Sequence, residues 1–177
     1  MHCEVCYNAE MKAKIHNAAL LFTFVFIIEG IILISASESN GFGDHIEWHK
    51  WSNGVSLAKE TGRPLMVVLH KSWCPACKSL KPKFMASDTI AKLSTSFVMV
   101  NAKEGEEPMD QVMLDIDGKY IPRIIFLDYE ANVLPEIVNE SGNPQYKYYH
   151  MEAQSIVKAM KKTLATVKYE PKPFDEL

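Results

Sequence analysis

Short apolar runs without alternation divide the central part of the chain. They cover residues 65–69, 97–100 and 124–127. Such a run predicts a strand that is buried on both faces of a sheet. A turn at residues 128–132 is followed by a further apolar segment, and we predict a fourth strand over residues 133–138.

Apolar residues at helical spacing fill the segments between and after these runs. A short helix is predicted over residues 55–61, because Gly62 and Pro64 end it. Another begins at Cys74 and should kink at Pro82, and a third segment contains Ile90 and Leu93. The closing helix covers residues 151–167 and carries its apolar residues on one face. This order of elements predicts an α/β sandwich, a mixed sheet with helices on both faces.

The first 37 residues have a different pattern. Basic residues precede an apolar stretch at residues 18–28 that resumes at 31–34, and the small residues Ser35-Ala36-Ser37 follow. This order is typical of a secretory signal peptide over residues 1–37, which we expect to be cleaved. Met11 is an alternative start. The competing interpretation is an uncleaved membrane anchor, although Glu29 in mid-span would be costly there.

The remainder is long enough for one compact domain, which we place at residues 38–168, followed by a tail at 169–177. The net charge of -3 indicates neither a nucleic acid nor an anionic membrane surface as a partner, so a membrane is expected only if the N-terminal segment is retained. Cys3 and Cys6 precede the apolar stretch and should leave with it. Metal binding or acylation at that pair is the alternative.

The chemistry of the domain is expected at Cys74-Pro75-Ala76-Cys77, where an apolar run meets a predicted helix. As the N-cap, Cys74 would face the free amides and the positive end of the helix dipole, which favour a thiolate. Pro75 suits the first helical position. Cys77 lies one turn away, within bonding reach, and is expected to be the less exposed, resolving thiol. We therefore predict a dithiol that exchanges with disulfides through a mixed disulfide.

Two other interpretations of this motif compete with a reactive dithiol. A zinc site would need further ligands from the histidines, but no second CxxC and no HxxxH completes one, so we expect no metal. The available histidines are His45, His49, His70 and His150. A structural disulfide at this spacing would close too small a loop to stabilise much.

The sequence KSWCPACK at residues 71–78, with Pro82 after it, resembles the thioredoxin superfamily. The resemblance implies a three-layer sandwich and a cis peptide bond between Ile121 and Pro122. It also implies that Trp73, Ile121 and Pro122 form the surface that receives a substrate strand beside the reactive sulfur. Two positions depart from the family pattern. Val68 stands where a buried acid is usual, and Met99 where its lysine partner is usual.

Segments at residues 41–48, 64–74, 120–128 and 135–149 resemble more narrowly the small thioredoxins of the endoplasmic reticulum (ER) that are related to anterior-gradient proteins. This resemblance implies a luminal thiol–disulfide oxidoreductase that acts on cysteine-containing secretory proteins, with glutathione as the reductant and no tightly bound cofactor. The alternative is a client-binding chaperone module. Relatives of that kind often lack one cysteine of the motif, whereas both are present here.

Two short motifs bear on location. The chain ends in Phe174-Asp175-Glu176-Leu177, which resembles a signal read by the ER retrieval receptor. Asn139-Glu140-Ser141 is a glycosylation sequon that the same compartment could use. Both motifs agree with the ER lumen as the predicted location.

Overall fold

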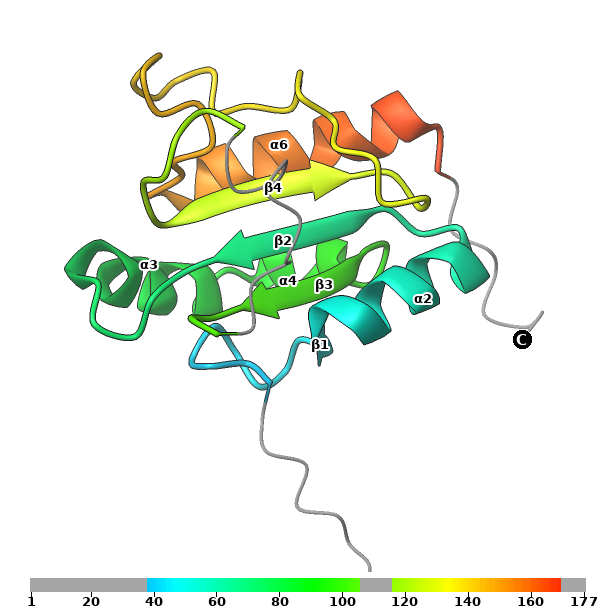
Figure 1. The fold of residues 1–177 in the computed structure, drawn as a ribbon, viewed down its shortest axis with the longest axis horizontal. Helices are drawn as coiled ribbons and strands as arrows, with labels where there is room; N and C mark the ends of the chain where they lie inside the picture. The colour runs from blue at the N-terminus through cyan, green and yellow to red at the C-terminus, as the bar shows by residue number, and fades with distance from the viewer. Residues whose placement is uncertain (1–37, 106–115, 170–177) are drawn as a thin grey trace, which may run out of the picture. The chain divides into compact units, whose positions relative to one another are not determined.

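The computed structural model describes residues 38–105 and 116–169, and the strands in these ranges form one mixed sheet (Figure 1). The order across the sheet is β1-β3-β2-β4. Strand β3 is parallel to β1 and β2, whereas β4 is antiparallel to β2. The strands are β1 (Trp48–His49), β2 (Leu65–Leu69), β3 (Val98–Ala102) and β4 (Arg123–Leu127).

Helices cover both faces of this sheet, so the predicted three-layer α/β fold is confirmed (Figure 1). Alternate residues of β2 point to opposite faces. Met66 and Val68 pack in a cluster with α3, α4 and α6, whereas Leu65 and Val67 pack in a second cluster with α2. The helices are α2 (Trp51–Thr61), α3 (Pro75–Met85), α4 (Asp88–Ser94) and α6 (Ala153–Val167).

The helix before β2 is longer than predicted. It begins at Trp51, whose half-buried side chain packs against the second cluster. It ends at Gly62, which has a φ of 70° and donates its N–H to the carbonyl of Ala58. Glycine adopts this left-handed conformation at no steric cost, and it therefore turns the chain into β2.

The predicted strand over residues 133–138 is wrong. Val133 forms only an isolated bridge with Leu127, and the chain then turns, with the N–H of Ile137 donating to the carbonyl of Leu134 at 3.1 Å. Pro135 explains the turn, because proline has no N–H to donate to a strand ladder. The two-residue strand β1 was not predicted, since it is too short to show a pattern.

Within the described ranges, no helix has the length and apolar character that crossing a bilayer requires. The predicted signal segment at residues 1–37 and the predicted retrieval signal at residues 174–177 lie outside these ranges. Both therefore stay predictions.

Candidate active site

The CxxC motif lies at the junction between the loop after β2 and the start of α3. Cys74 is the N-cap residue, with extended backbone angles of φ -74° and ψ 119°, and Pro75 is the first helical residue. The N–H of Cys77 donates to the sulfur of Cys74 over 3.3 Å. A free amide of the first helical turn therefore faces this sulfur, as the sequence predicted.

The two cysteines are unequally accessible, and neither forms a disulfide. The exposed fraction is 5% for Cys74 and 0% for Cys77. Burial, followed by the hydrogen bond with Cys74, raises the pKa of Cys77 to about 12. Cys77 therefore holds its proton at neutral pH, and only Cys74 can be met by a disulfide from outside.

The peptide bond between Ile121 and Pro122 is cis, as predicted. It brings the Ile121 carbonyl to the dithiol, where the Cys74 thiol donates to it over 3.9 Å. Pro122 is buried, Ile121 is half-buried, and Trp73 is 67% exposed. Trp73 and Ile121 thus belong to two different segments of the chain, and both lie next to the Cys74 sulfur.

Val68 and Met99 are both buried in the cluster that contains α3, so no ionisable side chain occupies these two positions. In the sheet Val68 pairs with Asn101, and Met99 pairs with Met66. The buried polar side chains at this end of the sheet include His70, Asn101 and Arg123. Sequence reasoning considered His70 only as a zinc ligand and missed Asn101.

His70, Asn101 and Ser39 form a buried polar chain, with exposed fractions of 1%, 1% and 4%. The amide of Asn101 donates to the Ser39 carbonyl over 2.6 Å, and its oxygen lies 2.6 Å from Nε2 of His70. Burial lowers the pKa of His70, so the ring is neutral near pH 7. The contact joins residues 31 apart and depends on the register of β2 and β3, which no local pattern reveals.

Glu104 fixes the loop that precedes Cys74. One carboxylate oxygen accepts from the backbone N–H of Ser72 over 2.8 Å, and the other accepts from the Ser72 hydroxyl. These hydrogen bonds, that of the side chain first, lower the pKa of Glu104 to about 2. Sequence reasoning missed this contact, because its two partners are 32 residues apart.

Glu104→Ala should therefore loosen this loop. Charge-assisted hydrogen bonds are stronger than neutral ones, so we expect the Ser72 amide to exchange with deuterium about tenfold faster. Hydrogen-exchange mass spectrometry of the peptide around residue 72 measures the effect. The matched control is Glu60→Ala, on the exposed side of α2. Equal exchange in wild type and Glu104→Ala would contradict the role.

The four histidines considered as zinc ligands are not gathered together. His150 contacts Ser155 through Nδ1, and His70 contacts Asn101. Among residues 38–105 and 116–169, no group of three or more His, Cys, Asp or Glu side chains is arranged to hold a metal ion.

The sequon asparagine is engaged within the domain. Nδ2 of Asn139 donates to the Tyr149 carbonyl over 2.8 Å, and its Oδ1 accepts from the Ser141 N–H over 3.3 Å. A glycan attached at Nδ2 would take the place of one of its two amide hydrogens. Asn139 therefore has a structural contact in the folded domain, and its glycosylation stays a prediction.

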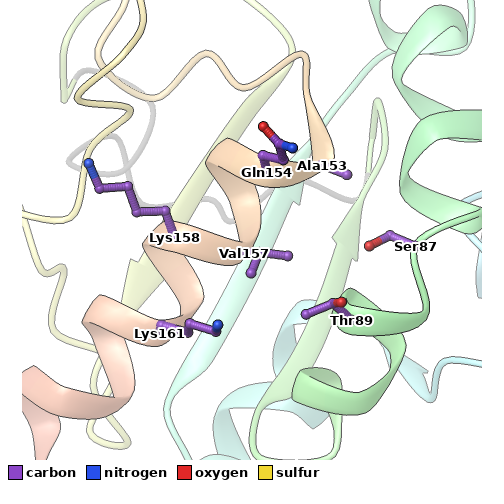
Figure 2. Close-up of a pocket in the computed structure, with 7 residues that line it drawn as sticks. All are labelled: Ser87, Thr89, Ala153, Gln154, Val157, Lys158 and Lys161. Carbon is purple, nitrogen blue, oxygen red and sulfur yellow. The ribbon is translucent and has the colours of Figure 1, made fainter.

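A pocket of about 380 Å³ lies between α4 and α6, and neither cysteine of the motif lines it. Figure 2 shows Val157 of α6 and Thr89 of α4 facing each other across the gap, whereas Lys158 points away from it. The lining residues are Ser87, Thr89, Ala153, Gln154, Val157, Lys158 and Lys161. Ser87 is already used as the N-cap of α4, where its hydroxyl accepts from the Ile90 N–H. The dithiol is therefore the better candidate for chemistry.

Comparisons with known proteins show the family and the fold of the chain. A family model described as thioredoxin-like matches residues 47–128. The chain is 34% identical over 133 residues to anterior gradient protein 2-B of Xenopus laevis, covering 75% of this chain and 79% of the relative. It is 34% identical to the anterior gradient protein 2 homolog of Mus musculus, covering 75% and 74%. Anterior gradient protein 3 of Mus musculus is 29% identical and is covered over 99% of its length.

Among solved structures, a thioredoxin from Thermus thermophilus is similar in fold. It superimposes with a TM-score of 0.50 and 17% identity, covering 70% of this chain and 90% of that protein. At this identity the likeness concerns the fold, which agrees with the sheet order and the helices described above.

Proposed function

Since this chain belongs to the anterior gradient family of thioredoxin-like proteins, we propose that it is a protein thiol–disulfide oxidoreductase. Cys74 is the nucleophile and Cys77 the resolving thiol. The observation that carries the proposal is the Cys74 sulfur at the N-terminus of α3, where it accepts from the Cys77 N–H. Reactive cysteines of disulfide exchange commonly lie at helix N-termini, and the thiolate is the form that attacks disulfides.

The exchange proceeds in two displacements. The Cys74 thiolate attacks a client disulfide, whose S–S bond breaks; one client sulfur leaves as a thiolate and takes up a proton, and the other is joined to Cys74. Cys77 then loses its proton and attacks the Cys74 sulfur, which releases the second client thiol and leaves a Cys74–Cys77 disulfide. Two electrons pass to the client. Two glutathione thiols then reduce the Cys74–Cys77 disulfide and become oxidised glutathione.

The client would lie against the exposed Trp73 and the half-buried Ile121, with Pro122 shaping the surface. Its chemistry is that of a secretory protein with cysteines. The proposed place of action is the ER lumen, reached through the signal segment at residues 1–37 and kept by a retrieval receptor that binds residues 174–177.

A client-binding chaperone module is the second candidate. The observation that favours it is Trp73, whose indole is 67% exposed beside the site and could hold an apolar client segment without chemistry. If a Cys74→Ser/Cys77→Ser variant restored client folding fully in cells that lack the protein, this candidate would replace the first.

The test of the proposed function is reduction of insulin disulfides by the full chain with glutathione. Cys74→Ser should abolish the activity, because no other accessible thiol is held at the N-terminus of α3. Cys77→Ser should instead accumulate a mixed disulfide with the client, since the resolving thiol is missing.

The matched control is Cys3→Ser/Cys6→Ser, which removes the other CxxC of the chain and should leave the activity unchanged. Activity retained by Cys74→Ser, or lost only in the control, would overturn the assignment. The trapped disulfide can be identified by mass spectrometry of the peptide that contains Cys74.

A further inference from the structure

The buried Cys77 thiol needs a proton acceptor before it can displace a client from Cys74. Thiolates and not thiols attack disulfides, yet this thiol is fully buried and its sulfur is shielded from bulk water. Val68 and Met99 offer no acceptor. The acceptor must come from a neighbouring polar group.

His70 is a polar group of this kind, and it lies near Cys77 in the fold. The backbone of Lys71 makes a hydrogen bond to the Cys77 sulfur, and Lys71 directly follows His70. His70 also lies on the sheet face that α3 covers, because its ring contacts Phe42 with centroids 5.0 Å apart. Lys81, one turn beyond Cys77 in α3, lies over the same Phe42 ring at 5.5 Å.

The hydrogen bonds of His70 determine which ring nitrogen is basic. The Asn101 amide nitrogen is used by the Ser39 carbonyl, so the Asn101 oxygen faces His70 and accepts from Nε2. Nε2 therefore carries the hydrogen of the neutral ring, and Nδ1 has a lone pair. In the described structure Nδ1 is buried and has no hydrogen-bond partner. A buried, unsatisfied acceptor is costly unless a partner reaches it during function.

We propose that His70 accepts the Cys77 proton at Nδ1 in the step in which Cys77 displaces the client from Cys74. This inference rests on the proposed function. The S–H bond of Cys77 breaks, its electron pair forms the bond to the Cys74 sulfur, and the Cys74–client bond breaks. The client sulfur leaves as a thiolate. The proton on Nδ1 then passes to that thiolate or to solvent, which returns His70 to its neutral form.

The charge state of Cys74 makes this transfer feasible. Burial is the largest cause that raises the pKa of Cys77, and the hydrogen bond and the charge of Cys74 raise it further. In the mixed disulfide the Cys74 sulfur is uncharged and bonded to the client, so the two causes that come from Cys74 are removed and burial remains. The protonated ring would then face the new Cys77 thiolate, and opposite charges at short range stabilise each other.

Neighbouring groups both raise and lower the pKa of His70. Lys81 from α3 and Lys103 after β3 lower its pKa, whereas Glu104 and the hydrogen bond with Asn101 raise it; burial is the largest effect and lowers it. His70 is therefore an unprotonated base through the neutral range, in which disulfide exchange must operate.

The test uses the full chain with Cys3→Ser/Cys6→Ser, so that Cys74 and Cys77 are its remaining cysteines. An excess of an aromatic disulfide reagent that releases a coloured thiolate is added by rapid mixing. The first equivalent of colour reports attack by Cys74, and the second reports resolution by Cys77. His70→Gln keeps an amide donor toward Asn101 but has no basic nitrogen. General-base assistance is typically worth 10²–10⁴-fold, so we expect a second phase about 10²-fold slower with an unchanged first phase.

The pH dependence separates proton transfer from a structural effect. In the wild type the rate of the second phase should become independent of pH above the pKa of His70. In His70→Gln this rate should keep rising about tenfold per pH unit up to the pKa of the Cys77 thiol. Equal rates and profiles in both proteins would overturn the role of His70. So would a variant in which both phases slow equally. Absence of the first phase from the wild type would instead overturn the proposed function.

His70→Phe is a second variant that keeps an aromatic ring against Phe42. It leaves the Asn101 oxygen without a donor, so it should lose stability as well as the fast second phase. Comparison with His70→Gln shows whether slow resolution follows loss of the base or loss of stability.

Discussion

Phe84→Ala is expected to lower the free energy of unfolding by about 3–5 kcal/mol, the usual cost of removing a buried phenylalanine side chain. Phe84 is fully buried in the cluster beneath α3. Its ring meets Phe42 edge-on with centroids 5.6 Å apart and lies 5.7 Å from the ring of Trp48. Alanine would leave a cavity that these rigid rings cannot close.

Urea denaturation of the reduced protein measures the effect. Met85→Ala is the matched control, because Met85 is the next residue of α3 and is 49% exposed. It should change the free energy of unfolding by less than about 1 kcal/mol. A loss below about 1.5 kcal/mol for Phe84→Ala would mean that α3 is not anchored by this cluster. Since Phe42 also contacts His70, the variant tests the support of the site as well as the core.

The elements that could be predicted from the sequence are those with a strong local signal. Residues 65–69 form a strand with the predicted bounds, because five consecutive apolar residues suit a position between two helical layers. The segment at 133–138 had a similar apolar character, but Pro135 and the backbone turn between Leu134 and Ile137 prevent a strand. Local hydrophobicity does not show whether a neighbouring strand has a free edge to pair with.

In the candidate site too, features set by local sequence could be predicted, whereas contacts between distant residues could not. The positions of Cys74 and Pro75 follow from helix-capping rules that act within one turn, and the sequence was sufficient for them. The contacts between His70 and Asn101 and between Ser72 and Glu104 join residues 31 and 32 apart. They exist only because β2 and β3 pair in one register, which places Val68 opposite Asn101. Short polar side chains at strand ends gave no signal of that pairing.

Acid should destabilise the protein through His150, by about 3 kcal/mol between pH 7 and pH 4. Burial lowers the pKa of this imidazole to about 4, compared with 6.5 in the unfolded chain. Below pH 6.5 the unfolded state therefore binds a proton that the folded state resists. The stabilisation is complete above pH 6.5 and is lost as the pH falls toward 4. His49 and His70, whose pKa values are also lowered, act in the same direction.

His150→Asn isolates this contribution. Asparagine can keep a polar contact with Ser155, which His150 makes through Nδ1 over 3.1 Å, but it cannot take up a proton. The readout is the change in the free energy of unfolding between pH 7 and pH 4, measured by urea denaturation, because absolute stability also changes with side-chain volume. The variant should lose most of the change, whereas the exposed control His45→Gln should keep it. Glu104 and Glu140 have pKa values of about 2 in the folded protein, compared with 4.5 in the unfolded chain. Their effect on stability therefore falls mainly below pH 4.5 and cannot account for a loss that begins near pH 6.5. An unchanged slope in His150→Asn would show that the buried ring does not resist protonation in the folded state.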